Sequence, residues 1–532
     1  MLMWKNGEKM LRLALSAAVL LFSGCAKDFA PEGNEDKSWG EDVGHGMIEL
    51  GKQLDDPYSV KNITKAIRNL YPTKAPREDV SPTDRYVRFL PENEDEMDRL
   101  VAMGLDLMDH PLDYQIIKDG DYYHDPLLSE ECITWQYAVV PHDFTLPDGI
   151  RCEILDECYI PTEVTKSAGG MDWEAIEREA YRISGNAELL APDTKASGSG
   201  PKGRICIKDE DFNGGKPFGV SGVKIVCNSF VKFSSAYTDR DGYYQMSRRF
   251  SSKVRYRLRF RNREGFSIGL NLLLVRASAS ALGKASGEGI DYTVTSSSDG
   301  NLFSRCAVNN AVYDYIQRCS EDDLGIGRPV EDLRIWIFRK LSAGSSPMLH
   351  HGAVLDQEIF AKYLGEYARL IKVFLPDMTL GLRNADSYAE IYRRCCHQLA
   401  HVSHYASVGN DWWNPYMKYL MLSLAESLGE TAYGSGDGDG AGHCAVSEMW
   451  AYFLQEYLYH DRYGGASQSE GLTYWFRPQI FQYLSERGMK PRHFFSVLKP
   501  QVKDVSDLKD RLQQRYPSKS EMIEQIFSRY AD

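Results

Sequence analysis

The five residues from His397 to His401, His-Gln-Leu-Ala-His, constrain the fold more than any other part of this chain. On an α-helix, residues four apart lie on the same face one turn apart, so the two histidines would point the same way. Two imidazoles placed like this can share one tetrahedral Zn²⁺. The surrounding pattern predicts a helix from Asp386 to Tyr405, which is therefore the candidate metal helix.

The motif resembles the His-Glu-x-x-His helix of the zincin metallopeptidases, with a different residue at its second position. In that family, the carboxylate after the first histidine takes a proton from the metal-bound water. Gln398 stands there in this chain, and an amide can hydrogen-bond that water but has no useful basicity. Loss of a general base costs ~10²–10⁴-fold in rate. The chain thus keeps the metal-ligand pattern with a degenerate base position, which predicts little or no hydrolysis.

A third metal ligand is expected from a later helix. In the gluzincin branch of that family it is a Glu, and Glu448, at the start of an apolar helical run, is the best match. His404 shares the helix face of His397 but lies ~10 Å further along the axis, too far to share a tetrahedral ion easily. The resemblance therefore implies a zinc site of His397, His401 and Glu448, with His404 in the cleft or beside the ligands.

Other interpretations of these residues stay open. The segment from Asp437 to Glu448 has the spacing of an EF-hand calcium loop, although Ala441 removes one oxygen ligand. The thiols of Cys395 and Cys396 could bind zinc, although both lie on other helix faces than His401. A histidine pair inside a helix can also merely satisfy hydrogen bonds in the core.

Residues 1–25 are expected to be a targeting segment. Basic residues precede the apolar run from Leu13 to Phe22, which is too short to span a bilayer. The run ends at Phe22-Ser-Gly-Cys25, which resembles a bacterial lipobox and implies a lipidated Cys25 as the mature N-terminus. Residues 26–45 are polar and predict a tether. We therefore expect a cell-envelope protein held to outer-membrane lipid through Cys25, on the surface or periplasmic face.

The mature chain divides into three predicted parts, and the fold class is α+β with several domains. The first part mixes a helical pattern at Met97 to Met108 with a strand-like run at Cys132 to Val140. A stretch rich in Gly and Ser then predicts a linker. The predicted order begins with an α+β domain at residues 46–192 and a linker at 193–203. A small β-sandwich at 204–270 and a mainly helical domain with an edge strand at 290–532 follow.

The predicted β-sandwich contains a turn from Thr238 to Tyr244 in which Gly242 supplies the positive φ. The segment resembles the transthyretin-like regulatory domains of carboxypeptidases, which implies a folded spacer or regulatory module without catalysis. Asp239 and Asp241 are interpreted as turn formers, with metal or sugar binding as an alternative. Strands are expected at Arg204–Lys208, Val223–Cys227 and Arg255–Phe260.

The last part is predicted to be mostly helical, with amphipathic spacing at Glu331 to Arg339 and at Asp356 to Ile371. Lys372 to Leu382 is extended and contains Pro376, which a strand tolerates at an edge or bulge. The order of strand, short turn and metal helix resembles the zincin arrangement, which implies a cleft edge where a peptide can add by β-pairing. With the sandwich and the anchor, the chain resembles zincin-like lipoproteins of Bacteroidetes.

The net charge of the chain limits the kinds of molecule that it is expected to bind. The formal net charge of −13, from 75 acidic and 62 basic residues, is spread along the chain and disfavours nucleic acid. The favoured function is a lipoprotein that uses the zincin cleft to bind peptide or glycoprotein with little or no hydrolysis. The first alternative is an active zinc peptidase in which Glu426, Glu430 or Glu456 replaces the base, and the second is a structural lipoprotein without metal.

Overall fold

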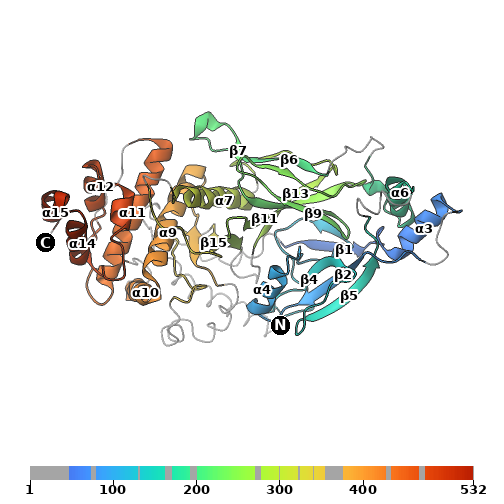
Figure 1. Ribbon diagram of the computed structural model, residues 1–532, viewed down its shortest axis with the longest axis horizontal. Helices are drawn as coiled ribbons and strands as arrows, with labels where there is room; N and C mark the ends of the chain where they lie inside the picture. The colour runs from blue at the N-terminus through green and yellow to red at the C-terminus, as the bar shows by residue number, and fades with distance from the viewer. Residues whose placement is uncertain are drawn as a thin grey trace, which may run out of the picture.

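The computed structural model describes residues 47–530 except 74–78, 130–131, 162–169, 192–199, 270–276, 299, 321–323, 340, 354–374, 427–432 and 466–473. Within these residues the protein has an α+β fold with several sheets and a large helical part (Figure 1). Cys25, the tether and most of the predicted linker lie outside the described residues. No helix in the described part of the chain combines the length and the apolar character needed to cross a membrane.

A three-stranded antiparallel sheet forms the centre of the N-terminal part, in the order β4 (Gln136–Pro141), β2 (Asp84–Leu90), β5 (Arg151–Cys158). The strand predicted at Cys132 to Val140 is confirmed in its second half, where β4 lies. The predicted helix at Met97 to Met108 is only partly confirmed, because helix α4 spans Glu94–Ala102. It ends there since Gly104 adopts a left-handed φ of 76° just beyond it.

Two further pairs of elements complete this part. Strand β1 (Glu49–Gln53) pairs antiparallel with β3 (Tyr114–Lys118). Helix α3 (Val60–Leu70) packs against α6 (Trp173–Ile183) through a small apolar core. At the boundary with the following sheet, the buried Lys232 ammonium lies 2.7 Å from the buried Glu177 carboxylate of α6, which ties the two parts together.

Two sheets share one core in the middle of the chain, where Ile205, Ile225, Tyr256 and Leu258 are fully buried. The strands predicted at residues 204–208, 223–227 and 255–260 are confirmed. The smaller sheet has the order β10-β6-β14 with β7 beside β6, and the larger has the order β16-β15-β12-β11-β8-β9 with β13 beside β11. The strands of residues 202–294 are β6 (Lys202–Ile207), β7 (Phe218–Gly219), β8 (Val223–Ser229), β9 (Lys232–Tyr237), β10 (Tyr243–Gln245), β11 (Val254–Asn262), β12 (Ser267–Gly269), β13 (Ala279–Ala285) and β14 (Tyr292–Val294).

The turn between β9 and β10 forms as expected. Gly242 has a φ of 83°, and one carboxylate oxygen of Asp239 accepts the backbone N–H groups of Asp241 and Tyr243, each at 2.9 Å. Asp239 is therefore a turn former. Neither Asp239 nor Asp241 belongs to a group of possible metal ligands within the residues described.

The larger sheet continues from the sandwich into the C-terminal part. Strand β11 turns into β12, and β15 (Arg334–Phe338) and β16 (Met378–Gly381) then add in parallel. The amphipathic helix expected at Glu331 to Arg339 is wrong, because β15 occupies this position. All five residues of β15 are buried, and a sheet strand covered on both faces favours such a continuous β-branched and aromatic run.

Helices cover this end of the sheet in successive layers, α7 (Gly300–Arg318), α9 (Tyr388–Val408) and α11 (Ala441–Tyr463), with α10 (Asn410–Glu426) beside them (Figure 1). The helix predicted to carry the two histidines is confirmed as α9. It begins where the Ser387 side chain accepts the N–H of Glu390 and ends at Gly409, whose φ is 77°. The helix expected at Asp356 to Ile371 lies outside the described residues.

The C-terminal helices pack on the outer side of α11 and close the helical core (Figure 1). Phe453 of α11 contacts Phe481 and Phe494 there, with ring centroids 5.8 Å and 5.0 Å away. This second layer makes α11 a buried helix, which fixes the position of the side chains on its inner face. The helices are α12 (Gln479–Glu486), α13 (Pro491–Phe495), α14 (Val505–Arg515) and α15 (Ser520–Phe527).

Candidate metal centre

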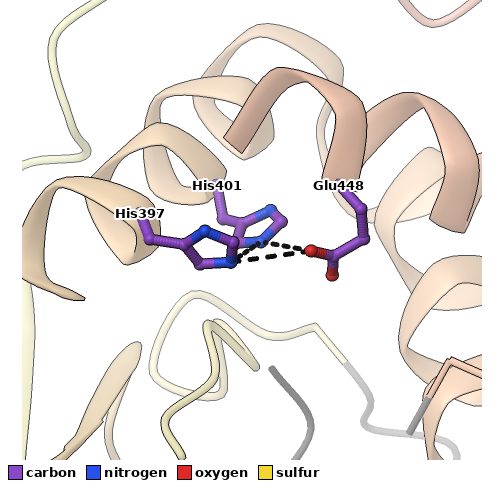
Figure 2. A group of neighbouring side chains, drawn as sticks. All are labelled: His397, His401 and Glu448. Atoms are coloured by element: carbon purple, nitrogen blue, oxygen red, sulfur yellow. Dashed lines mark hydrogen bonds and ion pairs between the residues drawn. The ribbon is translucent and has the colours of Figure 1, made fainter. Parts of the chain in front are cut away.

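Helices α9 and α11 bring His397, His401 and Glu448 together in the interior (Figure 2). The two Nε2 atoms of the histidines lie 3.2 Å apart, and each lies 3.5 Å from the same carboxylate oxygen of Glu448. All three side chains are almost fully buried. The structure therefore unites the three residues that the sequence resemblance implied as ligands.

The spacing of these atoms suits a small tetrahedral cation. Bonds of about 2.0–2.2 Å to one Zn²⁺ place neighbouring ligand atoms roughly 3.3–3.5 Å apart. The three measured separations, 3.2, 3.5 and 3.5 Å, fall close to this range. Two imidazoles and one carboxylate are also a common donor set for zinc with one further position. The residues present therefore fit the ion.

The Glu448 carboxylate is ionised and oriented by its neighbours. Burial alone would raise the pKa of Glu448, but the facing imidazoles of His401 and His397 outweigh burial and hold that pKa well below its usual range. The hydroxyl of Tyr416 on α10 donates to the other carboxylate oxygen at 2.6 Å. Glu448 is thus an oriented, ionised carboxylate that offers one oxygen to the histidines.

Ser447 connects the site to His404. Its hydroxyl lies 2.9 Å from Nδ1 of His401 and 3.3 Å from Nδ1 of His404. If His401 binds the ion through Nε2, its Nδ1–H donates to Ser447, whose own proton then points to His404. Burial lowers the pKa of His404 well below its usual value, so this ring is neutral. His404 lies beside the group of possible ligands and does not belong to it.

Gln398, the residue at the base position, lies next to the ligands and is buried. The hydroxyl of Ser346 donates to the side-chain oxygen of Gln398 at 2.8 Å and to its backbone carbonyl at 3.1 Å. A cavity of about 10 Å³ adjoins His397 and Gln398. That volume is about what one water molecule needs. The amide thus faces a space suited to a single water.

The competing ligand interpretations find no support in this geometry. Burial raises the pKa of the Cys395 and Cys396 thiols, and neither thiol belongs to the metal-ligand group found within the described residues. The calcium-loop interpretation is wrong for Glu448. Helix α11 already begins at Ala441, and the Glu448 carboxylate faces the histidines instead of the preceding loop.

Two of the three acids considered as a substitute base, Glu426 and Glu456, are described, and neither belongs to the candidate metal-ligand group. Glu426 is exposed at the end of α10, and Glu430 lies outside the described residues. Glu456 lies two helical turns beyond Glu448 and accepts hydrogen bonds from Arg393 and from the Gln455 amide, the latter at 2.8 Å. The Glu456 carboxylate is thus bound to Arg393 and Gln455, away from the two histidines.

Four side chains around the site were not found by sequence reasoning: Ser346, Trp413, Tyr416 and Ser447. Ser447 has a sequence signal, since it precedes Glu448 on the same helix. Ser346 precedes β16 in the chain, whereas Trp413 and Tyr416 lie on α10. Only the tertiary fold brings these three to the site.

Comparison with known proteins adds no identification. No protein-family model matches the chain, and neither a curated protein nor a solved structure matches it.

Proposed function

We propose that this protein is a lipid-anchored cell-envelope protein whose C-terminal part is a degenerate, zincin-like metallopeptidase domain of the gluzincin type. In this proposal the domain binds zinc and has little or no hydrolytic activity. The observation that carries it is the buried group of His397, His401 and Glu448 beside Gln398. The transthyretin-like assignment of residues 204–270 belongs to the same proposal, as a spacer between anchor and metal domain.

The arrangement of elements supports the zincin-like assignment. A strand (β16) and a short turn precede the helix with both histidines, and a later helix supplies the Glu. The antiparallel strands β8, β9 and β11 and the smaller sheet support the sandwich assignment. Lipidation of Cys25 and location at the outer membrane rest on the lipobox-like sequence alone.

The chemistry of the site explains why hydrolysis would be weak. Zinc bound here would act as a Lewis acid toward a ligand at its remaining position. His397, His401 and Glu448 would hold it, and Tyr416 would orient the carboxylate. Gln398 can hold a water by hydrogen bonding but cannot take its proton, and its oxygen is already engaged by Ser346. Without a base, the rate falls ~10²–10⁴-fold.

Zinc stoichiometry of the detergent-purified full chain tests this proposal. We expect about one equivalent of zinc in the natural protein and a clear loss in His397→Ala, because the ion loses one of three protein ligands. His460→Ala is the matched control, since His460 lies on α11 but contacts Glu456 instead of the site. Absence of zinc from the natural protein, or its full retention in His397→Ala, would contradict the proposal. A peptide or glycoprotein stays the expected ligand.

A further inference from the structure

The sheet edge next to the metal helix is formed by the chain segment from Leu341 to Leu349. This segment runs antiparallel along β16: Thr379 and Ser345 exchange backbone hydrogen bonds of 2.7 and 3.2 Å, and the Arg383 N–H donates to Leu341. Further along, Met348 donates to Asp377. The outer side of β16, expected to be an open cleft edge, is therefore already paired.

The side of this segment that faces away from β16 is also engaged. Backbone groups of an extended chain alternate in direction, so Ser342, Gly344 and Ser346 present theirs outward. The buried Arg394 guanidinium of α9 donates to the Ser342 carbonyl at 3.2 Å, and the indole N–H of Trp413 in α10 donates to the Ser346 carbonyl at 3.0 Å. Two of the three acceptors that an incoming strand would use are thus occupied.

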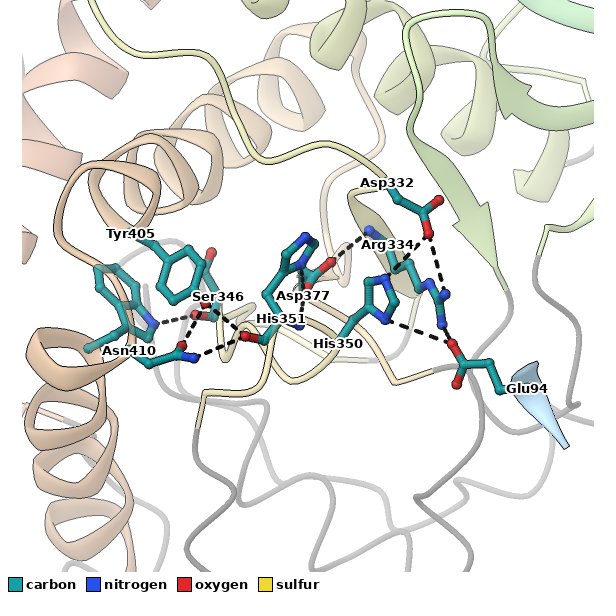
Figure 3. A network of polar contacts seen from close by, with 10 residues as sticks. Glu94, Asp332, Arg334, Ser346, His350, His351, Asp377, Tyr405 and Asn410 are labelled. Atoms are coloured by element: carbon teal, nitrogen blue, oxygen red, sulfur yellow. Dashed lines mark hydrogen bonds and ion pairs between the residues drawn. The ribbon is translucent and has the colours of Figure 1, made fainter. Parts of the chain in front are cut away.

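A third anchor holds the end of the segment. The Asn410 amide donates to the His351 carbonyl at 3.1 Å, and the Tyr405 hydroxyl, 3.0 Å from the same carbonyl, also donates to the Asn410 side-chain oxygen at 2.6 Å (Figure 3). The His351 ring in turn lies 2.9 Å from the fully buried Asp377 carboxylate. Helices α9 and α10 therefore hold the segment at its start, middle and end.

The described residues leave a small cavity between this segment and His397. The cavity of about 10 Å³ is bounded by Gly344 on the segment side and by His397 and Gln398 on the helix side. Sites for drug-sized ligands are typically ~300–1,000 Å³, whereas ~10–15 Å³ holds a single water. Trp413 is itself fully buried, with its ring centroid 6.1 Å from that of His401.

We propose that a latch of four side chains holds segment 342–351 closed over the metal centre: Arg394, Trp413, Tyr405 and Asn410. With the latch closed, the site admits a metal ion and a water-sized ligand. It excludes an extended peptide. The identity of the ion rests on the proposed function, whereas the latch does not. A peptide or glycoprotein ligand then binds the protein elsewhere, unless the latch opens.

Hydrogen exchange of the full chain tests the latch without any metal. Trp413→Phe keeps an aromatic ring and removes the N–H donor, so amides of residues 341–349 should exchange roughly fivefold faster or more, as expected for one lost hydrogen bond. Trp412→Phe is the matched control, because the equally buried Trp412 indole donates to the Val502 carbonyl at 2.7 Å instead. Equal exchange of the segment in both variants would overturn the proposal.

A second variant keeps the test valid if Trp413→Phe does not fold. Asn410→Ala removes one donor to His351 at a partly buried position and should raise exchange of residues 348–351 above that of the natural protein. Unchanged exchange there would also count against the latch.

Exclusion of peptides is tested on the cobalt-loaded protein. The visible absorption of bound Co²⁺ reports loading, so failure to load would count against the proposed function and leave the exchange test of the latch intact. With Co²⁺ bound, a dipeptide hydroxamate at millimolar concentration should leave the spectrum of the natural protein unchanged. A spectral shift at micromolar concentration would overturn the exclusion.

Discussion

The Ser346 hydroxyl donates to the side-chain oxygen of Gln398 at 2.8 Å and so joins the sheet edge to the metal helix at the position where a base is missing. A hydroxyl donates to a carboxylate as readily as to an amide oxygen. A Glu at position 398 would therefore keep this partner, and its shape is nearly that of Gln. The surroundings of Gln398 are thus compatible with the acid that the zincin motif carries.

Gln398→Glu should fold, retain zinc and hydrolyse peptides faster than the natural protein, and adding Trp413→Phe should raise the rate roughly fivefold further, because the reaction needs both a base and access. We expect at least a tenfold increase for the double variant, within the range of ~10²–10⁴-fold that a general base supplies. Cleavage of a mixed peptide library followed by mass spectrometry measures it. Gln398→Glu with Trp412→Phe should be no faster than Gln398→Glu alone, because Trp412 donates to Val502 instead. This account would be contradicted if the natural protein already cleaves peptides and Gln398→Glu does not raise the rate.

Removal of zinc should lower the thermal midpoint of the natural protein. An ion present at 100 times its Kd stabilises the folded state by ~2.7 kcal/mol. At roughly 2–4 °C per kcal/mol for a domain of this size, the midpoint should fall by about 5–10 °C when a chelator is added. Calorimetry of Glu448→Gln supplies the control, because this variant should show little further change with chelator. An equal drop in both proteins would mean that the chelator acts at another site.

The helix and the side-by-side placement of its two histidines could be predicted because helical periodicity puts His397 and His401 on one face wherever the helix lies. Glu448 was predicted as the third ligand because the order of elements resembles that of the gluzincins. Its position opposite the two histidines, where α9 meets α11, supports that prediction. By contrast, Arg334 to Phe338 has charged neighbours whose spacing fits a helix. Its strand conformation depends on pairing with β12 and β16, which sequence periodicity does not reveal.

The latch and the partners of the ligands could not be predicted for a related reason. Ser346, Trp413 and Tyr416 act through single hydrogen bonds to groups on other elements. Nothing in their local sequence indicates those partners, because the packing of α10 against the sheet edge creates them. The predicted edge strand was right in its conformation at Met378 to Gly381, but the segment that pairs with its outer side has no strand-like sequence pattern.

Cys25→Ser should release the protein from membranes. Residues 26–45 are mostly polar in sequence and contain no apolar run that could replace acyl chains in holding the protein. Fractionation of cells after expression of the natural and variant proteins measures the effect. Zinc content of the released variant should match that of the natural protein, since Cys25 is not among the ligands. Complete retention of the variant with membranes would contradict the lipobox interpretation.

The buried ion pair of Glu177 and Lys232 should control how stability depends on pH. Burial raises the pKa of Glu177, but the Lys232 ammonium 2.7 Å away outweighs it, together with hydrogen bonds from Tyr58 and Ser251, so the folded pKa lies below its usual value. Such a group adds stability above its unfolded pKa of about 4.3, and this stability is lost as the pH falls through the folded pKa.

Lys232→Met should reverse this dependence. Without the ammonium, burial dominates and raises the folded pKa of Glu177, so the variant should lose stability as the pH rises from 4 to 7. Breaking one side of a buried pair costs ~3–5 kcal/mol at neutral pH, and Lys232→Met with Glu177→Gln should recover most of it. Urea unfolding at pH 4 and pH 7, monitored by tryptophan fluorescence, measures all three proteins. If Lys232→Met loses the same free energy of unfolding relative to the natural protein at pH 4 and at pH 7, Glu177 is not the titrating group.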